Sequence, residues 1–245
     1  PEESSENSGI TEEKNGWVEE SDGIHYYQEG KDLRNAGYSL DGYWYYFDAD
    51  GVMKQNSFRQ KNGQSFYYDG EGHLVLNEEL DINGKHYKFT ESGAAYTGLY
   101  TDGTDTYYYQ ADGSRAEDAG MQLNGYWCYF QKDGKMLYSD WREKDTGYYY
   151  YDDQGHLILN AGIQFNGYWY YLDGSGRRYE SQFRQKGADW YYYDEEGHLV
   201  LNRDMKIGKY RYIFQNNGAA YRGLKTENGK VIGLPRWADR HLMMV

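Results

Sequence analysis

The chain has 245 residues, a formal net charge of -13 and a hydrophobic content of only 39%. Nucleic acids and anionic membranes attract clustered Lys and Arg, so this acidic balance argues against both as partners. No apolar run approaches the roughly 20 residues of a membrane-spanning helix. A single cysteine, Cys128, excludes an internal disulfide framework.

The first 20 residues are acidic, rich in serine and without hydrophobic periodicity, which predicts a disordered linker over residues 1–20. Residues 21–225 are repetitive and contain most of the 31 tyrosines. Residues 226–245 break the repeat. We expect them to form a terminal cap or the start of a domain that is missing from this sequence.

A glycine recurs every 21 residues, with one step of 20, at Gly30, Gly51, Gly72, Gly93, Gly113, Gly134, Gly155, Gly176, Gly197 and Gly218. An aromatic cluster precedes most of these glycines. A fixed short period indicates small supersecondary units stacked on their neighbours. Because aromatic residues favour strands and no segment has helical periodicity, we predict an all-β fold, a β-hairpin solenoid of about ten repeats of ~21 residues.

Within one unit, the sequence predicts a strand over 43–47, a polar turn over 48–51 and a short return strand over 52–54. Side chains alternate along a strand, so Tyr45 and Phe47 lie on one face and Trp44 and Tyr46 on the other. Cys128 takes the place of Tyr45 in a matching unit, and we expect it to be buried.

The sequence also repeats with a longer period, in addition to the period of 21 residues. Residues 35–51 recur at 160–176, and residues 77–99 recur at 202–224, both after 125 residues. The chain therefore contains a block of about six units that is used nearly twice. Any ligand site should recur with the same offset.

No catalytic or metal site is predicted. Aspartates recur at one turn position, where an Asp side chain hydrogen-bonds its own backbone; they are Asp48, Asp69, Asp152, Asp173 and Asp194. Three histidines follow the repeat glycine in separate units, and we expect a packing or surface role for His73, His156 and His198. We therefore expect no cofactor and no enzyme activity from this chain.

The motif Gly-Tyr-Trp-x-Tyr occurs three times, beginning at Gly42, Gly125 and Gly167. An exposed ring stacks on the C–H face of a sugar, while neighbouring amides bond the sugar hydroxyls. Several weak sites on one array gain affinity through effective concentration. The predicted carbohydrate-binding residues are Tyr43, Trp44, Tyr46, Gln122, Tyr126, Trp127, Tyr129, Gln164, Tyr168, Trp169, Tyr171 and Trp190.

The segments 41–53 and 120–136 resemble the cell-wall-binding and glucan-binding repeats of Gram-positive bacteria. The resemblance covers about 200 residues, and it implies a β-hairpin solenoid. In the choline-binding branch, a tryptophan on the first strand helps form an aromatic cage. Here only Trp141 keeps that tryptophan, and the positions that we align with it hold Phe58, Leu80, Leu99, Met121, Ile163, Phe183, Met205 and Leu224. The glucan-binding branch, which pairs aromatic rings with Gln, is similar around Gln122 and Gln164.

We therefore predict a non-catalytic module that binds a glucan or another cell-surface polysaccharide. It would anchor or target a secreted protein outside the cell or at the bacterial surface. The module could belong to a larger enzyme, such as a glucansucrase or a wall hydrolase, whose catalytic domain is not in this sequence. Two alternatives stay open: a choline- or teichoic-acid-binding anchor, and a protein-binding adhesin or spacer arm.

Overall fold

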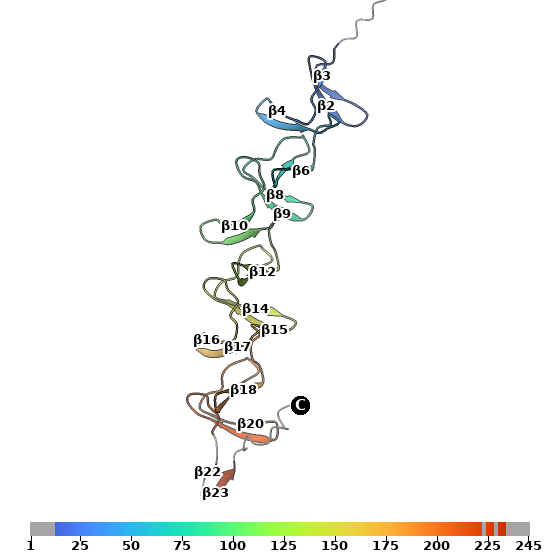
Figure 1. The fold of residues 1–245 in the computed structure, drawn as a ribbon. Coiled ribbons are helices and arrows are strands. Elements are labelled where there is room, and N and C mark those ends of the chain that lie inside the picture. Colours follow the sequence, from blue (N-terminus) through green and yellow to red (C-terminus); the bar gives the residue numbers. More distant parts are fainter. Residues whose placement is uncertain (1–12, 222–223, 228–229, 234–245) are drawn as a thin grey trace, which may run out of the picture. The chain divides into compact units, whose positions relative to one another are not determined.

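The computed structural model describes residues 13–221, 224–227 and 230–233. All regular structure in these ranges is β, arranged as successive hairpins (Figure 1), so the predicted fold class is confirmed. The strands are β1 Gly16–Glu19, β2 Ile24–Gln28, β3 Lys31–Asp32, β4 Ala36–Leu40, β5 Tyr43–Phe47, β6 Ser57–Lys61, β7 Gln64–Tyr68, β8 Glu79–Ile82, β9 Lys85–Lys88, β10 Gly98–Thr101, β11 Thr106–Tyr109, β12 Ala119–Leu123, β13 Tyr126–Phe130, β14 Asp140–Lys144, β15 Gly147–Tyr151, β16 Ala161–Phe165, β17 Tyr168–Leu172, β18 Gln182–Lys186, β19 Asp189–Tyr193, β20 Arg203–Ile207, β21 Tyr210–Phe214, β22 Leu224–Glu227 and β23 Lys230–Gly233.

In five of the described hairpins, the turn is a two-residue Asx-Gly step. Strands β4 and β5 pair antiparallel up to Leu40 and Tyr43, which leaves Asp41 and Gly42 as the turn. Their φ angles are 52° and 88°, as a type I′ turn requires. The backbone twist of this turn matches the twist of the two strands. The same step recurs at 62–63, 83–84, 124–125 and 166–167.

The predicted turn over 48–51 is present, because the N–H of Gly51 donates to the carbonyl of Asp48 at 3.1 Å. However, the recurring glycine does not lie in the turn of the main hairpin, and the predicted return strand over 52–54 is wrong. Residues 48–51 form the connection that follows the hairpin. Asp48 Oδ1 accepts the backbone N–H groups of Asp50 and Val52, both at 3.1 Å. Beyond it, Met53 makes only an isolated bridge with Phe47. The structural role predicted for the repeated aspartates is confirmed, because Asp69, Asp152, Asp173 and Asp194 accept equivalent backbone bonds.

Main-chain hydrogen bonds join each hairpin to its neighbour. After β7, the N–H of Leu74 donates to the carbonyl of Trp44 on β5 at 2.7 Å, and the N–H of Val75 donates to Tyr67 at 3.0 Å. One connection therefore holds two hairpins together. The same pair of hairpins recurs where Leu157 donates to Trp127 and where Leu199 donates to Trp169.

The core is a series of small aromatic clusters. Phe47, Phe130 and Leu172 are fully buried at the ends of β5, β13 and β17. Phe47 packs with Tyr45 and Met53 in one such cluster. Full burial of one such side chain contributes roughly 1.5–3 kcal/mol, so each hairpin depends on its own cluster. Cys128 is buried as expected, and burial raises the pKa of its thiol.

The chain divides into two compact units, one of residues 1–118 with 132–135 and one of residues 119–131 with 136–245. Strand β1 lies inside the range 1–20 that we expected to be a linker, and it pairs with β2. Strands β22 and β23 also pair. Residues 1–12 and 234–245 lie outside the described residues, so the linker and cap remain predictions there. Within the described ranges, no helix is long and apolar enough to cross a membrane.

Candidate functional site

Three hairpins present a tryptophan ring to solvent at the same place in the repeat. They are β4–β5, β12–β13 and β16–β17. The exposed fraction is 48% for Trp44, 48% for Trp127 and 45% for Trp169. The neighbouring Tyr45 is buried, in line with the predicted alternation along the strand. We refer to the surroundings of Trp44, Trp127 and Trp169 as sites 1, 2 and 3.

An arginine from the next hairpin covers the tyrosine beside each exposed tryptophan. In site 1, Cζ of Arg59 lies 3.7 Å from the ring centroid of Tyr46. This distance corresponds to a stacked guanidinium. The equivalent distances are 3.5 Å for Arg142 and Tyr129 in site 2 and 3.6 Å for Arg184 and Tyr171 in site 3.

A second tyrosine fixes each arginine from the side. Burial raises the pKa of Tyr68, and a hydrogen bond with Arg59 opposes that rise. The same causes act on Tyr193, whose pKa rises to about 12 next to Arg184. Each guanidinium is therefore held by one ring face and one hydroxyl. In site 2, burial likewise raises the pKa of Tyr151, and a hydrogen bond with Arg142 opposes that rise.

An exposed leucine completes each site. Leu76 follows the segment that hydrogen-bonds Trp44, and 42% of its surface is exposed. Its equivalents are Leu159, 46% exposed, and Leu201, 42% exposed. In site 1 these groups line a cleft of about 620 Å³, which also contacts Lys61, Glu91 and Ser92. The volume of this cleft lies within the range of ligand sites, and its lining combines aromatic and aliphatic side chains with charged and polar ones.

The tyrosine before each tryptophan lies on the opposite face of the hairpin. The Tyr43 ring stacks on His73, with centroids 3.8 Å apart. Tyr126 stacks on His156 and Tyr168 on His198 in the same way. The structure thus separates the predicted residues into two sets: Trp44 and Tyr46 share a site, whereas Tyr43 contacts a histidine elsewhere.

The two predicted glutamines lie directly opposite the tryptophans of sites 2 and 3. Gln122 pairs with Trp127 and Gln164 with Trp169 across the hairpin. Gln122 Nε2 also donates to the carbonyl of Gly125 at 3.3 Å. Site 1 has Ser39 at this position, so its polar groups differ.

The structure does not group Trp190 with the three sites. It pairs with Gln185 on β18 and packs against the core of the last hairpins. Its ring contacts Phe183 edge-on at 6.5 Å. Trp190 is therefore a partly buried packing residue.

Trp141, on the first strand of its hairpin, lies in an aromatic cage that the chain itself fills. Cζ of Arg178 lies 5.2 Å from the Trp141 ring, 4.1 Å from the Tyr148 ring and 5.8 Å from the Tyr170 ring. Glu180 accepts two bonds from this guanidinium, at 2.9 and 2.7 Å. Three rings around one cation are the arrangement that recognises quaternary ammonium groups.

The strand register corrects part of the alignment to Trp141. Trp141 is the second residue of β14 and pairs with Tyr150. The second residue of β12 is Gly120, and that of β16 is Gly162. Glycines therefore hold this position in two hairpins, and Met121 and Ile163 lie one residue further along.

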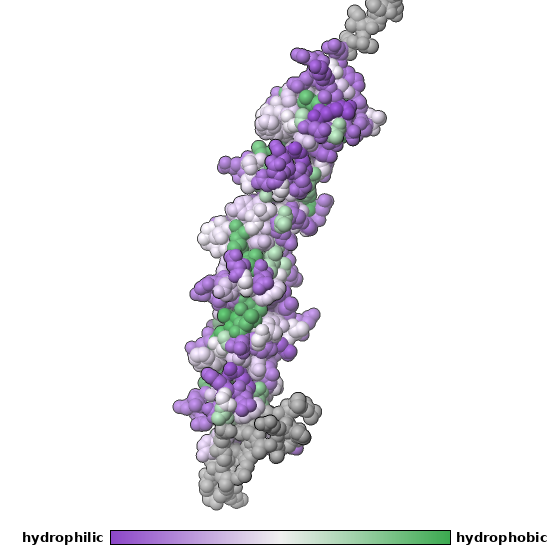
Figure 2. All heavy atoms as spheres, viewed as in Figure 1, coloured by the Kyte–Doolittle hydropathy of each residue, from purple (hydrophilic) through white to green (hydrophobic). Residues whose placement is uncertain are grey.

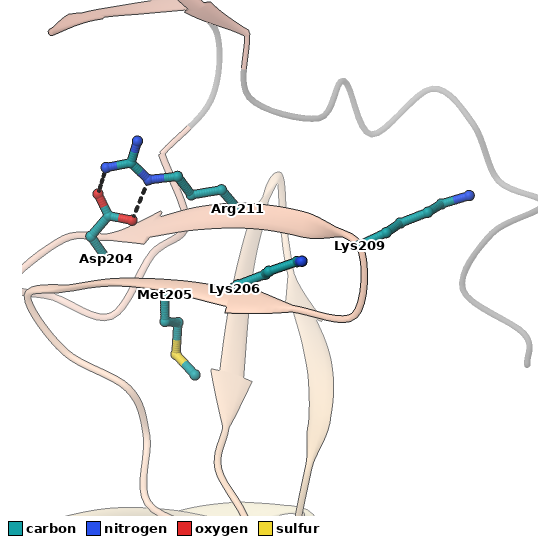
Figure 3. Close-up of a pocket in the computed structure, with 5 residues that line it drawn as sticks. All are labelled: Asp204, Met205, Lys206, Lys209 and Arg211. Carbon is teal, nitrogen blue, oxygen red and sulfur yellow. Dashed lines mark hydrogen bonds and ion pairs between the residues drawn. The ribbon is translucent and has the colours of Figure 1, made fainter.

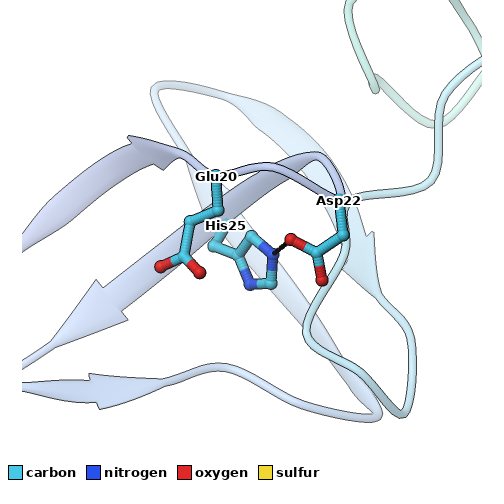
Figure 4. Close-up of side chains that lie close together, drawn as sticks. All are labelled: Glu20, Asp22 and His25. Carbon is cyan, nitrogen blue, oxygen red and sulfur yellow. Dashed lines mark hydrogen bonds and ion pairs between the residues drawn. The ribbon is translucent and has the colours of Figure 1, made fainter.

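Two clusters of acidic residues and histidine are already internally bonded. Figure 4 shows His25 between Glu20 and Asp22, with Nε2 at 3.1 Å from Asp22 Oδ1. Burial lowers the pKa of His25, but hydrogen bonds to Asp22 and Asp32 outweigh it and raise the pKa above its ordinary value. Glu20 accepts bonds from a lysine and a tyrosine. The other cluster is Asp194, Glu196 and His198.

A second hollow, of about 310 Å³, lies on β20–β21. Charged groups dominate its lining, and Arg211 forms a double ion pair with Asp204, as Figure 3 shows. Met205 is the one apolar lining residue. Without an aromatic ring in its lining, this hollow is a weaker candidate for sugar binding than sites 1 to 3.

On the face seen in Figure 2, hydrophobic residues of the described chain form small separate areas between hydrophilic ones. A protein-binding surface of ordinary size is a larger continuous apolar patch. On this face, the distribution favours several small sites over one broad apolar interface.

The sequence prediction missed the arginines, the leucines and the Arg178 cage. The arginines carried one signal, because Phe-Arg-Gln-Lys occurs at 58–61 and again at 183–186. Their contact with the tyrosine of the preceding hairpin depends on how hairpins stack, which a local pattern does not encode.

Comparison with known proteins agrees with the predicted repeat family. Residues 38–53 and 163–177 match the model of the putative cell wall binding repeat, so the chain contains repeats of this type. Both matches include the tryptophan strand of a site. A search of curated protein sequences finds no match.

Solved structures of Streptococcus pneumoniae proteins share the fold. The choline-binding domain of CbpL is 19% identical, with a TM-score of 0.57 over 87% of this chain and 99% of that one. CbpJ is 20% identical, with a TM-score of 0.60 over 89% and 91%. The modular autolysin LytC is 22% identical, with a TM-score of 0.53 over 81% of this chain and 50% of LytC. The chain thus spans about half the length of that autolysin.

Proposed function

We propose that this chain, which contains cell wall binding repeats, is a non-catalytic module that binds carbohydrate at three equivalent sites. The ligand is a glucan or another cell-surface polysaccharide, and the module acts outside the cell, at a bacterial surface. The observation that carries the proposal is the recurrence of one arrangement at Trp44, Trp127 and Trp169. In each case an exposed indole adjoins an arginine-covered tyrosine and an exposed leucine.

The chemistry of the site suits a sugar ring. An indole and a leucine offer flat apolar surface for the C–H face, and the arginine and nearby amides offer donors for hydroxyl groups. Each site is shallow and open to solvent, which favours an extended polymer over a small enclosed ligand. Three weak sites on one chain give a higher overall affinity for a repeating polymer.

Arg178 argues against choline binding at the cage of Trp141. In the cage of Trp141, Tyr148 and Tyr170, the guanidinium occupies the place that a ligand cation would take. A choline molecule would have to displace a group held by Glu180. Relatives such as choline binding protein F, solved with a peptidoglycan analogue, keep a wall glycan among the ligands to test.

Affinity electrophoresis tests the proposal. Native gels would contain dextran, other glucans or solubilised cell-wall polysaccharide, each with and without free choline. We expect retardation by at least one polysaccharide, unchanged by choline. Trp44→Ala, Trp127→Ala and Trp169→Ala should each weaken retardation several-fold, and the triple variant should abolish it.

The matched control is Leu99→Ala, which removes a side chain that is 48% exposed on β10, away from the three sites. It should leave retardation unchanged. Retention only on cell wall, with release by choline, would support the anchor instead. Migration unaffected by every polysaccharide would refute the proposal and direct attention to protein partners.

A further inference from the structure

Each of the three sites carries two positive charges in an otherwise acidic chain. The first strand of the hairpin that supplies the arginine reads Ser-Phe-Arg-Gln-Lys in site 1, and its equivalents end in Arg-Glu-Lys and Arg-Gln-Lys. Alternate residues of a strand share a face, so Lys61 lies on the same face as Arg59. Both line the cleft beside Trp44. The other pairs are Arg142 with Lys144 and Arg184 with Lys186.

In site 1, Arg59 is held in a fixed orientation. One face of the Arg59 guanidinium stacks on Tyr46, and Tyr68 lines the same cleft. Both partners are neutral, so they fix the orientation of the guanidinium without neutralising its charge. A fixed planar guanidinium binds carboxylate or phosphate through two parallel bonds and loses little entropy in doing so.

The lysines stand at the open edge of the sites. Lys61, Lys144 and Lys186 are all exposed and end the first strand of their hairpins. The intervening Glu143 of site 2 points to the opposite face, where it accepts a bond from Tyr148 at 3.0 Å. Each site thus places an arginine and an exposed lysine next to an exposed indole.

One acidic residue lines the cleft of site 1, and the equivalent residues beside sites 2 and 3 are not acidic. Glu91 contacts the cleft from the connecting turn of residues 90–93. The equivalent turn holds Gly174 beside site 2 and Asn216 beside site 3. Arginine and lysine are present in all three sites, whereas the carboxylate at this position is present in one.

We propose that the three sites select polysaccharides that carry anionic substituents, carboxylate or phosphate, over neutral glucans. This inference rests on the proposed carbohydrate-binding function and specifies its ligand class. The indole would stack on a sugar ring, while the Arg–Lys pair would bind the charged substituent. A net charge of -13 repels anionic polymers over the rest of the surface, so binding to one requires local cationic sites.

Retention on three matched columns tests the inference: neutral dextran, carboxymethyl dextran and phosphorylated dextran. We expect at least about tenfold longer retention on one anionic matrix than on neutral dextran at low ionic strength, with the preference lost near ~0.5 M salt. The two anionic columns distinguish carboxylate from phosphate. Trp44→Ala, Trp127→Ala and Trp169→Ala combined should abolish retention on all three.

The decisive comparison is between two triple variants, each of which replaces three lysines and so removes the same amount of positive charge. Lys61→Gln, Lys144→Gln and Lys186→Gln together change the net charge from -13 to -16, and so do Lys132→Gln, Lys206→Gln and Lys209→Gln. The first set should lose most of the preference for anionic matrices, and the second set should keep that preference. All six positions are exposed, so folding is preserved.

Equal retention on neutral and anionic matrices would overturn this inference but leave the proposed function standing. Equal losses in the two lysine triples would also overturn it, because bulk charge would then explain the preference. Elution at the void volume from all three columns, together with no retardation in any gel, would overturn both proposals.

Discussion

The hydroxyl of Tyr45 lies 3.0 Å from Nε2 of His73, although the two residues belong to different hairpins. The contact recurs at 2.9 Å between Tyr170 and His198. In the middle repeat, Cys128 stands where these tyrosines stand, and the equivalent histidine is His156. The cysteine sulfur lies 3.9 Å from its nearest bonding partner, a backbone carbonyl of its own strand. This repeat therefore lacks an interhairpin hydrogen bond that its two neighbours have.

We expect Cys128→Tyr to stabilise the protein by about 1 kcal/mol, the usual net value of one hydrogen bond. The backbone of this hairpin matches that of β4–β5 and β16–β17, which both accommodate a tyrosine here. Urea denaturation followed by tyrosine fluorescence measures the change. The converse substitution, Tyr170→Cys, should destabilise by more than this, because it also removes a buried ring that packs on Trp141 and His198. If Cys128→Tyr lowers the stability instead, the side chains around Cys128 pack too closely to admit a tyrosine ring.

Asp112 should make stability depend on pH in the acid range. Its carboxylate accepts the hydroxyl of Ser114 at 2.6 Å, which is the largest influence, and the N–H of the same residue at 2.9 Å. With Lys85, these bonds lower the pKa of Asp112 to about 2. A depressed pKa stabilises the folded state above the unfolded value of roughly 4. The contribution is lost as pH falls from there through about 2.

Thermal melts of wild type and Asp112→Asn between pH 7 and pH 2 check this expectation. The variant should melt at lower temperature near neutral pH and converge with wild type at the acid end. Because the Asp112 side chain is 53% exposed, solvent reduces the effect. Ser114→Ala should show the same convergence, since it removes the largest influence. A constant difference across the range would contradict the assignment.

Arg178→Met should open the aromatic cage. Methionine is the residue at the equivalent bridge positions, Met53 and Met136, so the fold accommodates it. We expect choline to raise the melting temperature of the variant and not that of wild type, because the freed rings of Trp141, Tyr148 and Tyr170 attract a quaternary ammonium.

The control for the cage is Arg115→Met, at the same repeat position. The guanidinium of Arg115 lies 5.5 Å from the Tyr107 ring and is bound to Glu117. It should gain no response to choline. If wild type responds to choline as strongly as the Arg178 variant, the guanidinium does not block the cage.

The hairpin repeat and the exposure of Trp44 could be predicted because both follow from local rules. The 21-residue period indicates stacked units, and strand alternation places Trp44 opposite Tyr45. Turn placement could not be predicted, because Asp41-Gly42 and the segment 48–51 are both good turn sequences. Only the pairing of Leu40 with Tyr43 distinguishes them.

The arginines show which part of the site could not be predicted from the sequence. Arg59 follows Tyr46 by 13 residues and comes from another hairpin. Its stacking distance depends on the rotation between hairpins, to which many weak contacts contribute. The same holds for Arg178, whose three aromatic partners come from β14, β15 and β17. Local patterns identify the aromatic partners of such sites but not the cations that cover them.

The recurring glycine should be sensitive to substitution for two separable reasons. Gly113 and Gly125 have φ angles of 87° and 88°, so alanine at either position costs about 1–2 kcal/mol of backbone strain. A Cβ on Gly125 would meet no atom within 4 Å, whereas a Cβ on Gly113 would lie 2.7 Å from Cβ of the buried Ala95. That methyl group cannot rotate away. We therefore expect Gly113→Ala to destabilise by a further 1–3 kcal/mol, roughly the cost of overpacking. Urea denaturation of the two variants measures the difference, and equal losses would show that backbone conformation alone explains the recurrence.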